Sequence, residues 1–141
     1  MESPRVPDSK ELTFRARLVT RWSDEDNHGV LNNAVYLTLL EEARQRWFGA
    51  LGLLVGNRFP FLLAQTNVRF VAPGRGGVEV VVEAATTALG TTSFTQAYRV
   101  RAAGTGEVWC EAEARLVCWD PVRGAKTPMT AEFRAALERG D

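Results

Sequence analysis

The sequence contains few of the side chains that form disulfides or bind metals: two cysteines and one histidine among 141 residues. Cys110 and Cys118 stand eight positions apart in one predicted strand, where a rise of about 3.3 Å per residue separates them by roughly 26 Å. At that distance they can neither pair with each other nor share a metal ion. We therefore expect two buried structural thiols and, with His28 as the single histidine, no metal site.

The sequence also lacks an excess of charge and long apolar runs. Lysine plus arginine number 17, as do aspartate plus glutamate, so no overall field attracts a polyanion such as DNA or RNA. Residues 1–11 are polar and contain prolines, and no later segment is apolar for long enough to span a bilayer. We expect a cytoplasmic protein without nucleic-acid or membrane partners. Its length suits a single domain over residues 1–141, with residues 1–10 as a flexible N-terminus.

The first half of the sequence predicts a strand, a polar loop and a long helix. Residues 12–22 alternate imperfectly between apolar and polar, as a half-buried strand does, and a polar loop follows. Asn32 and Asn33 stand where a helix N-cap belongs. From residue 34 to about residue 54, apolar residues recur every three or four positions, which indicates a helix with a buried face. Residues such as Leu37 widen this face, so we expect the helix to be largely enclosed by a curled sheet.

The second half predicts four strands and a short helix. The strands cover residues 61–71, 78–88, 91–102 and 107–119, and residues 130–139 have helical spacing. Short turns rich in glycine and proline join the strands, with Gly74-Arg75-Gly76-Gly77 as one hairpin turn, and such connections favour antiparallel neighbours. A strand, a long helix and an antiparallel meander place the chain in the α+β class.

The segment between the first strand and the long helix carries a distinctive pattern. Asp26 stands three residues before Gly29, Val30 follows, and Asn33 and Tyr36 belong to the helix start. This pattern resembles the strand-to-helix signature of the 4-hydroxybenzoyl-CoA thioesterase family of hot-dog-fold proteins, and the following Leu-Leu-Glu-Glu-Ala-Arg matches the family's helix. The resemblance extends more loosely over most of the chain. It implies a hot-dog fold, in which a curved antiparallel sheet of about five strands wraps a long central helix.

The resemblance also implies an acyl-CoA thioesterase, and the chemistry of that reaction suits these residues. Thioester hydrolysis needs a carboxylate, as nucleophile or as general base for water, and hydrogen-bond donors for the oxyanion. Asp26 is the expected catalytic carboxylate, in either role, and the Asn33 backbone N–H is the expected oxyanion donor at the helix start. The residues that the signature places against the substrate are Gly29, Val30, Tyr36 and His28.

The same family resemblance implies how the protein assembles. Relatives of this kind pair through an edge strand and the long helix, so we expect a homodimer or homotetramer with the acyl group between two protomers. Pairing also covers the unpaired edges of an open sheet. CoA enters as part of the substrate, and no separate cofactor is expected. The identity of the acyl group stays open.

Several of these residues also have a plain structural interpretation. Asp26 can be a turn residue that hydrogen-bonds its own loop, as aspartates before glycine commonly do. His28 is then a loop residue, and relatives that use a histidine carry it where Val30 stands here. Asp24 and Glu25 are expected to be solvated loop charges. Charges elsewhere that could serve a neighbouring subunit or the CoA phosphates, or simply lie on the surface, are Glu41, Glu42, Arg69, Arg75, Arg99 and Arg101.

Two other classes of function fit parts of the pattern. A non-catalytic acyl-CoA-binding hot-dog module would keep the pocket but would not need Asp26. An acyl-carrier-protein thioesterase or a dehydratase would belong to a neighbouring lineage, and the absence of a histidine directly after Gly29 counts against both.

Overall fold

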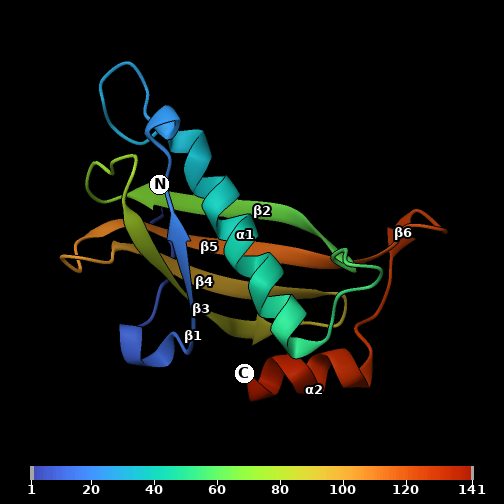
Figure 1. The fold of residues 1–141 in the computed structure, drawn as a ribbon. Coiled ribbons are helices and arrows are strands. Elements are labelled where there is room, and N and C mark those ends of the chain that lie inside the picture. Colours follow the sequence, from blue (N-terminus) through green and yellow to red (C-terminus); the bar gives the residue numbers. More distant parts are fainter. Residues whose placement is uncertain (1, 141) are drawn as a thin grey trace.

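A single long helix lies across one face of a curled antiparallel sheet in the computed structural model, which describes residues 2–140 (Figure 1). The helix α1 spans Asn33–Leu51, and a short helix α2 spans Ala131–Arg139. The strands are β1 (Phe14–Val19), β2 (Phe61–Phe70), β3 (Glu79–Leu89), β4 (Ser93–Ala102), β5 (Val108–Asp120) and the two-residue β6 (Ala125–Lys126). Two single-turn 3-10 helices, Ser9–Glu11 and Trp22–Asp24, flank β1. The predicted α+β class and the helices and main strands are confirmed.

The strands are ordered β1-β3-β4-β5-β2, with β6 paired to β5, and every pairing is antiparallel. The β3–β4 and β4–β5 connections are the predicted hairpins. The hairpin predicted at Gly74-Arg75-Gly76-Gly77 is wrong, because β2 pairs with β5 and not with β3. Residues 71–78 instead carry the chain from one edge of the sheet towards its opposite side, where β3 pairs with β1.

The core fills the space between α1 and the sheet. Helix residues Tyr36, Leu40, Ala43 and Trp47 are at most 2% exposed. Alternate residues of β5 face them from the sheet, including Cys110 and Cys118, which are buried free thiols as predicted. Burial raises the pKa of Cys110 to about 12, so this thiol stays protonated at neutral pH.

The ends of α1 follow from local chemistry. The Asn32 side chain caps the N-terminus by accepting a hydrogen bond from the Ala34 N–H. Gly52, with φ of +71°, ends the helix in the left-handed region that glycine adopts readily. The prediction that the helix is largely enclosed is wrong for one chain, because the sheet covers only one side of it. Leu37 on the open side is 43% exposed.

The N-terminal residues run over the outer face of the sheet. Leu12 is fully buried there, in a small apolar cluster with Ala85 and Ala97. The Asn67 side chain donates to the Glu2 carbonyl, and the Arg5 N–H donates to Glu113. These contacts tie the segment expected to be flexible to the sheet. Between residues 2 and 140, no helix is long and apolar enough to cross a membrane.

Candidate active site

The loop between β1 and α1 closes into a tight turn at Asp26. Glu25 and Leu31 form an isolated antiparallel bridge, which brings the two ends of the turn together. The Asp26 N–H donates to the Val30 carbonyl at 2.8 Å, and the Gly29 N–H donates to the Asp26 carbonyl at 3.0 Å. Gly29 has φ of +74°, a conformation that favours glycine. Asp26, Gly29 and Val30 are therefore spaced in the sequence as they are because all three belong to one closed turn.

The Asp26 carboxylate has one oxygen engaged in this turn. Its Oδ1 accepts a hydrogen bond of 2.8 Å from the His28 backbone N–H. The interpretation of Asp26 as a residue that bonds its own loop is thus confirmed. Within residues 2–140 the carboxylate accepts no other hydrogen bond, and the residue is only partly buried. The turn fixes the side chain through one oxygen and leaves the second available for chemistry, so the structural and catalytic interpretations are compatible.

The first turn of α1 leaves one backbone donor free. The Ala34 N–H donates to Asn32 Oδ1, and the Val35 N–H donates to the Asn32 carbonyl, each at 2.9 Å. The Asn33 N–H, between the cap and these bonded amides, donates to no group among the described residues. Asn33 is exposed. A free N–H at this end of a helix carries partial positive charge and is suited to an anion.

The other residues of the signature fall into two groups. His28 and Gly29 are exposed and Val30 is partly buried, and all three belong to the Asp26 turn. Tyr36 is only 2% exposed and lies in the core, where a Cβ on Gly74 would contact its hydroxyl. Burial raises the pKa of Tyr36 to about 12, so the phenol stays neutral. The structure thus does not bring Tyr36 to the surface beside Asp26, and its contact with substrate stays a prediction.

Asp24 and Glu25 are not the solvated loop charges that the sequence suggested. Asp24 is 7% exposed, and its carboxylate accepts from the Arg21 backbone N–H at 2.8 Å and from the guanidinium Nη2 at 2.8 Å. Hydrogen bonds from Arg21 outweigh burial and lower the pKa of Asp24, so it stays ionised. Glu25 Oε2 accepts from the Gly76 N–H at 2.9 Å. Both carboxylates brace the loop internally. The Glu25 partner could not be identified from local sequence, whereas Arg21 stands only three residues before Asp24 and was the signal that sequence reasoning missed.

The glycine-rich segment 71–78 packs against the candidate loop and forms hydrogen bonds with it. The Leu31 N–H donates to the Gly74 carbonyl at 2.9 Å, and the Thr20 hydroxyl donates to the Arg75 carbonyl at 2.8 Å. A Cβ on Gly76 would clash with the Arg21 carbonyl and lie 2.7 Å from the Trp22 Cα. Glycine is needed here for close backbone approach, and the run of glycines was the one signal in the sequence.

The candidate site lies outside five of the surface cavities formed by the described residues. Five surface cavities with volumes from about 270 to 640 Å³ lie along the described residues, and neither Asp26 nor Asn33 lines any of them. None of these five cavities is therefore a closed substrate pocket at Asp26.

A family model described as the thioesterase-like superfamily matches residues 20–137, which is most of the chain. The chain belongs to this superfamily. A thioesterase from Thermus thermophilus, solved with coenzyme A and zinc, is 30% identical over 87% of this chain and 95% of its own, with a TM-score of 0.78. No curated protein matches the chain.

Two further solved structures show the same fold at lower identity. A 1,4-dihydroxy-2-naphthoyl-CoA thioesterase from Synechocystis is 21% identical over 88% of this chain and 94% of its own, with a TM-score of 0.78. A Bacillus stearothermophilus protein, predicted to be a thioesterase, is 22% identical over 90% and 95%, with a TM-score of 0.82. The hot-dog fold expected from the sequence is confirmed for this thioesterase-like protein.

The close packing of Gly76 predicts a stability effect in the thioesterase-like chain. We expect Gly76→Ala to lower the free energy of unfolding by about 1–3 kcal/mol, because the added methyl group meets backbone atoms that cannot move separately from the loop. Chemical denaturation of the unmodified protein and of Gly76→Ala measures the difference in the free energy of unfolding. Gly104→Ala is the matched control, since nothing lies within 4 Å of a Cβ there and it should change stability little. Equal stability of the two variants would contradict the bracing role of segment 71–78.

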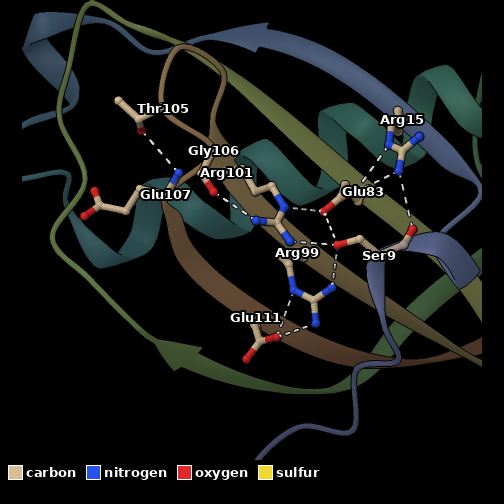
Figure 2. Close-up of polar contacts among 9 residues, drawn as sticks. All are labelled: Ser9, Arg15, Glu83, Arg99, Arg101, Thr105, Gly106, Glu107 and Glu111. Carbon is tan, nitrogen blue, oxygen red and sulfur yellow. Dashed lines mark hydrogen bonds and ion pairs between the residues drawn. The ribbon is translucent and has the colours of Figure 1, made fainter.

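Two arginines considered for the CoA phosphates are bound to carboxylates of the same thioesterase-like chain (Figure 2). Arg99 Nη2 lies 2.7 Å from Glu111, and Arg101 Nε lies 2.7 Å from Glu83. The Ser9 hydroxyl accepts hydrogen bonds from both guanidinium groups. Burial alone would raise the pKa of Glu83, but hydrogen bonds led by Arg101 outweigh it and lower that pKa. This cluster holds the N-terminal segment to the outer face of the sheet.

The remaining candidate charges of the thioesterase-like chain are less constrained. Arg69 lies 3.9 Å from Glu111, whereas the exposed side chain of Arg75 contacts no carboxylate among the described residues. Glu42 pairs with Arg46 at 3.4 Å, one of the interpretations offered by the sequence. Nowhere in residues 2–140 do three His, Cys, Asp or Glu side chains form a group that could hold a metal ion.

Proposed function

We propose that the protein hydrolyses acyl-CoA thioesters, with Asp26 as its catalytic carboxylate and the Asn33 N–H as an oxyanion donor. The observation that carries this proposal is the pairing of a turn that fixes Asp26 with a free backbone N–H at the start of α1. Membership of the thioesterase-like superfamily and the coenzyme A bound to the Thermus relative point to the same reaction class.

The two groups divide the reaction between them. The thioester carbonyl oxygen accepts a hydrogen bond from the Asn33 N–H, which stabilises the negative charge that develops when the carbonyl carbon is attacked. If Asp26 is the base, it takes a proton from the attacking water, the C–S bond breaks, and the thiolate of CoA leaves and is protonated. If Asp26 is the nucleophile, its oxygen displaces the thiolate, and water then hydrolyses the mixed anhydride. Both routes give a carboxylic acid and free CoA.

A second copy of the chain supplies a further wall of the site in this proposal. Among residues 2–140, strand β2 pairs only with β5, so its other edge is free of any described strand. Large apolar side chains beside that edge are 43–50% exposed: Leu37, Leu62, Leu63 and Phe70. A twofold dimer that joins two such edges would satisfy their backbone groups and cover these side chains. We propose a homodimer or a homotetramer built from it, with Gly29, Val30 and His28 facing substrate between protomers, in a cytoplasmic protein.

Release of free CoA thiol from a panel of acyl-CoAs tests this function. We expect turnover with at least one aliphatic or aromatic acyl-CoA, detected with a thiol reagent against a blank without enzyme. A flat response across the panel, together with acyl-CoA binding by calorimetry, would indicate a non-catalytic binding module instead. Hydrolysis confined to acyl-carrier-protein thioesters would assign the protein to the neighbouring lineage.

A further inference from the structure

Arg44 is a buried cation without a counter-ion. It lies on α1, is 5% exposed, and donates a hydrogen bond of 2.8 Å from Nε to the Tyr98 hydroxyl. Its Cζ lies 5.2 Å from the centre of the Tyr98 ring. Within residues 2–140 no carboxylate forms an ion pair with it. The other arginine buried to this degree, Arg99, does have such a partner in Glu111 (Figure 2).

The Nη nitrogens of Arg44 are not fully buried. A guanidinium has five N–H groups, and among the described residues Arg44 uses only the one on Nε. The one fully buried side-chain nitrogen without a partner in this part of the chain is Nε1 of Trp47. The Nη atoms of Arg44, which also lack partners, therefore remain accessible. Taking a charge out of water without pairing it costs several kcal/mol. An anion bound beside Arg44 would offset this cost.

Arg44 lines a cavity whose walls are mostly apolar. The cavity has a volume of about 390 Å³ and lies between α1, the β2 edge and β5, with Leu37, Leu40, Phe61, Leu63 and Leu116 among its lining residues. Thr38 and Thr66 are its neutral polar members. Glu41 also lies on its wall, but that side chain is exposed and forms no ion pair with Arg44. The cavity can hold an apolar chain that ends in an acceptor for Arg44.

The same cavity is aligned with the candidate oxyanion site. Asn33, Leu37, Leu40 and Arg44 follow one another at spacings of four, three and four residues, which places them along one face of α1. With a rise of about 1.5 Å per residue, the 11 residues from Asn33 to Arg44 span roughly 16 Å of helix. A thioester carbonyl at the Asn33 N–H would thus direct a medium-length acyl chain along this face towards Arg44.

We propose that Arg44 binds a carboxylate at the far end of the substrate's acyl group, in the cavity between α1 and β2. The planar guanidinium presents paired N–H groups that match both oxygens of a carboxylate. A neutral methyl end would leave the Arg44 charge unpaired in apolar surroundings. This inference rests on the proposed thioesterase function and names its substrate class: mono-CoA thioesters of dicarboxylic acids.

Matched pairs of substrates test the proposal with the unmodified protein. Sebacoyl-CoA is compared with decanoyl-CoA, and dodecanedioyl-CoA with dodecanoyl-CoA, by thiol release, because chains of ten and twelve carbons are long enough to reach from the Asn33 N–H to the Arg44 side chain. We expect kcat/KM to favour the carboxylate member by about 10- to 100-fold in at least one pair, the effect of a hydrogen bond to a charged group. Equal values, or preference for the neutral member in both pairs, would overturn the proposal while leaving the thioesterase function intact.

Substitutions of Arg44 assign the preference to this side chain. Arg44→Met should reduce the ratio of the two kcat/KM values to about one, and Arg44→Lys should retain part of it because the charge remains. Arg46→Met is the matched control: Arg46 lies two residues further on the same helix, with its side chain 52% exposed, and the ratio should not change. Persistence of the full ratio in Arg44→Met would show that another residue binds the carboxylate.

A calorimetric measurement separates this proposal from the function on which it rests. If no thioester is hydrolysed, the thioesterase function fails, but the relative affinities for dodecanedioyl-CoA and dodecanoyl-CoA can still be measured. Tighter binding of dodecanedioyl-CoA that Arg44→Lys weakens would uphold Arg44 as a carboxylate site. Equal affinities would reject it. Circular dichroism of each variant confirms that the compared proteins are folded.

Discussion

Asp26→Asn is expected to lower kcat for acyl-CoA hydrolysis by about 10²- to 10⁴-fold, the contribution of a positioned general base. The amide that replaces the carboxylate can neither take a proton from water nor attack the carbonyl. The side-chain oxygen of the asparagine can still accept a hydrogen bond from the His28 N–H. In the unmodified protein that hydrogen bond, of 2.8 Å to Asp26 Oδ1, stabilises the turn. The melting temperature and the oligomeric state should therefore stay close to those of the unmodified protein.

Asp120 offers a closely matched control for this substitution. Its Oδ1 accepts a hydrogen bond of 2.9 Å from the Val122 N–H, two residues ahead, as Asp26 does with His28. Asp120→Asn therefore makes the same chemical change in the same kind of turn, away from α1. Full activity in Asp120→Asn with loss in Asp26→Asn would identify a chemical role. Full activity in both variants would sink the assignment of Asp26.

Leu62→Asp should separate the protomers and lower kcat/KM by on the order of 10²-fold, the effect of misplacing catalytic groups relative to substrate. Leu62 is 50% exposed on the β2 edge and also lines the cavity at Arg44, so the state of assembly, and not the activity alone, decides the outcome. A carboxylate there would have to be buried against apolar side chains in the proposed interface. Analytical ultracentrifugation measures the assembly, and thiol release at the same protein concentrations measures the activity.

The control for Leu62→Asp uses an apolar residue outside the proposed interface. Val122 is 94% exposed in the turn between β5 and β6. Val122→Asp adds the same charge at an apolar side chain that is already almost fully exposed, and should change neither assembly nor activity. A protein that sediments as a monomer in its unmodified form, yet hydrolyses acyl-CoA, would refute the proposal that two chains build the site.

Local patterns predicted the elements well, because the spacing of apolar residues reports which face of each element is buried. The helix face at Tyr36, Leu40, Ala43 and Trp47 is an example. Strand order was beyond such patterns. Strand β2 pairs with β5, which follows it far along the chain, so that Phe61 lies opposite Cys118. No turn adjacent to β2 in the sequence indicates this pairing. The glycines at 74 and 76 were read as a hairpin turn when they serve close packing.

The candidate site was predictable where the family signature lies within one turn. Asp26, Gly29 and Val30 belong to one closed loop, so their spacing carries the geometry directly. The bracing by Glu25 was not predictable, since its partner, Gly76, lies 51 residues away. The bracing by Asp24 was within reach of local sequence, because its partner Arg21 stands three residues before it. The unpaired state of Arg44 was likewise hidden, because a nearby glutamate in the sequence suggests an ion pair that does not form.

The pairing of β2 with β5 has a consequence for how the chain folds as it is made. Residues 61–70 leave the ribosome well before residues 110–118, which are their partners in the sheet. During that interval β2 lacks its partner strand β5, and its apolar side chains are open to other chains. Sheet closure must wait until nearly the whole chain is available, which favours slow folding through long-range contacts and makes the nascent chain dependent on protection from aggregation.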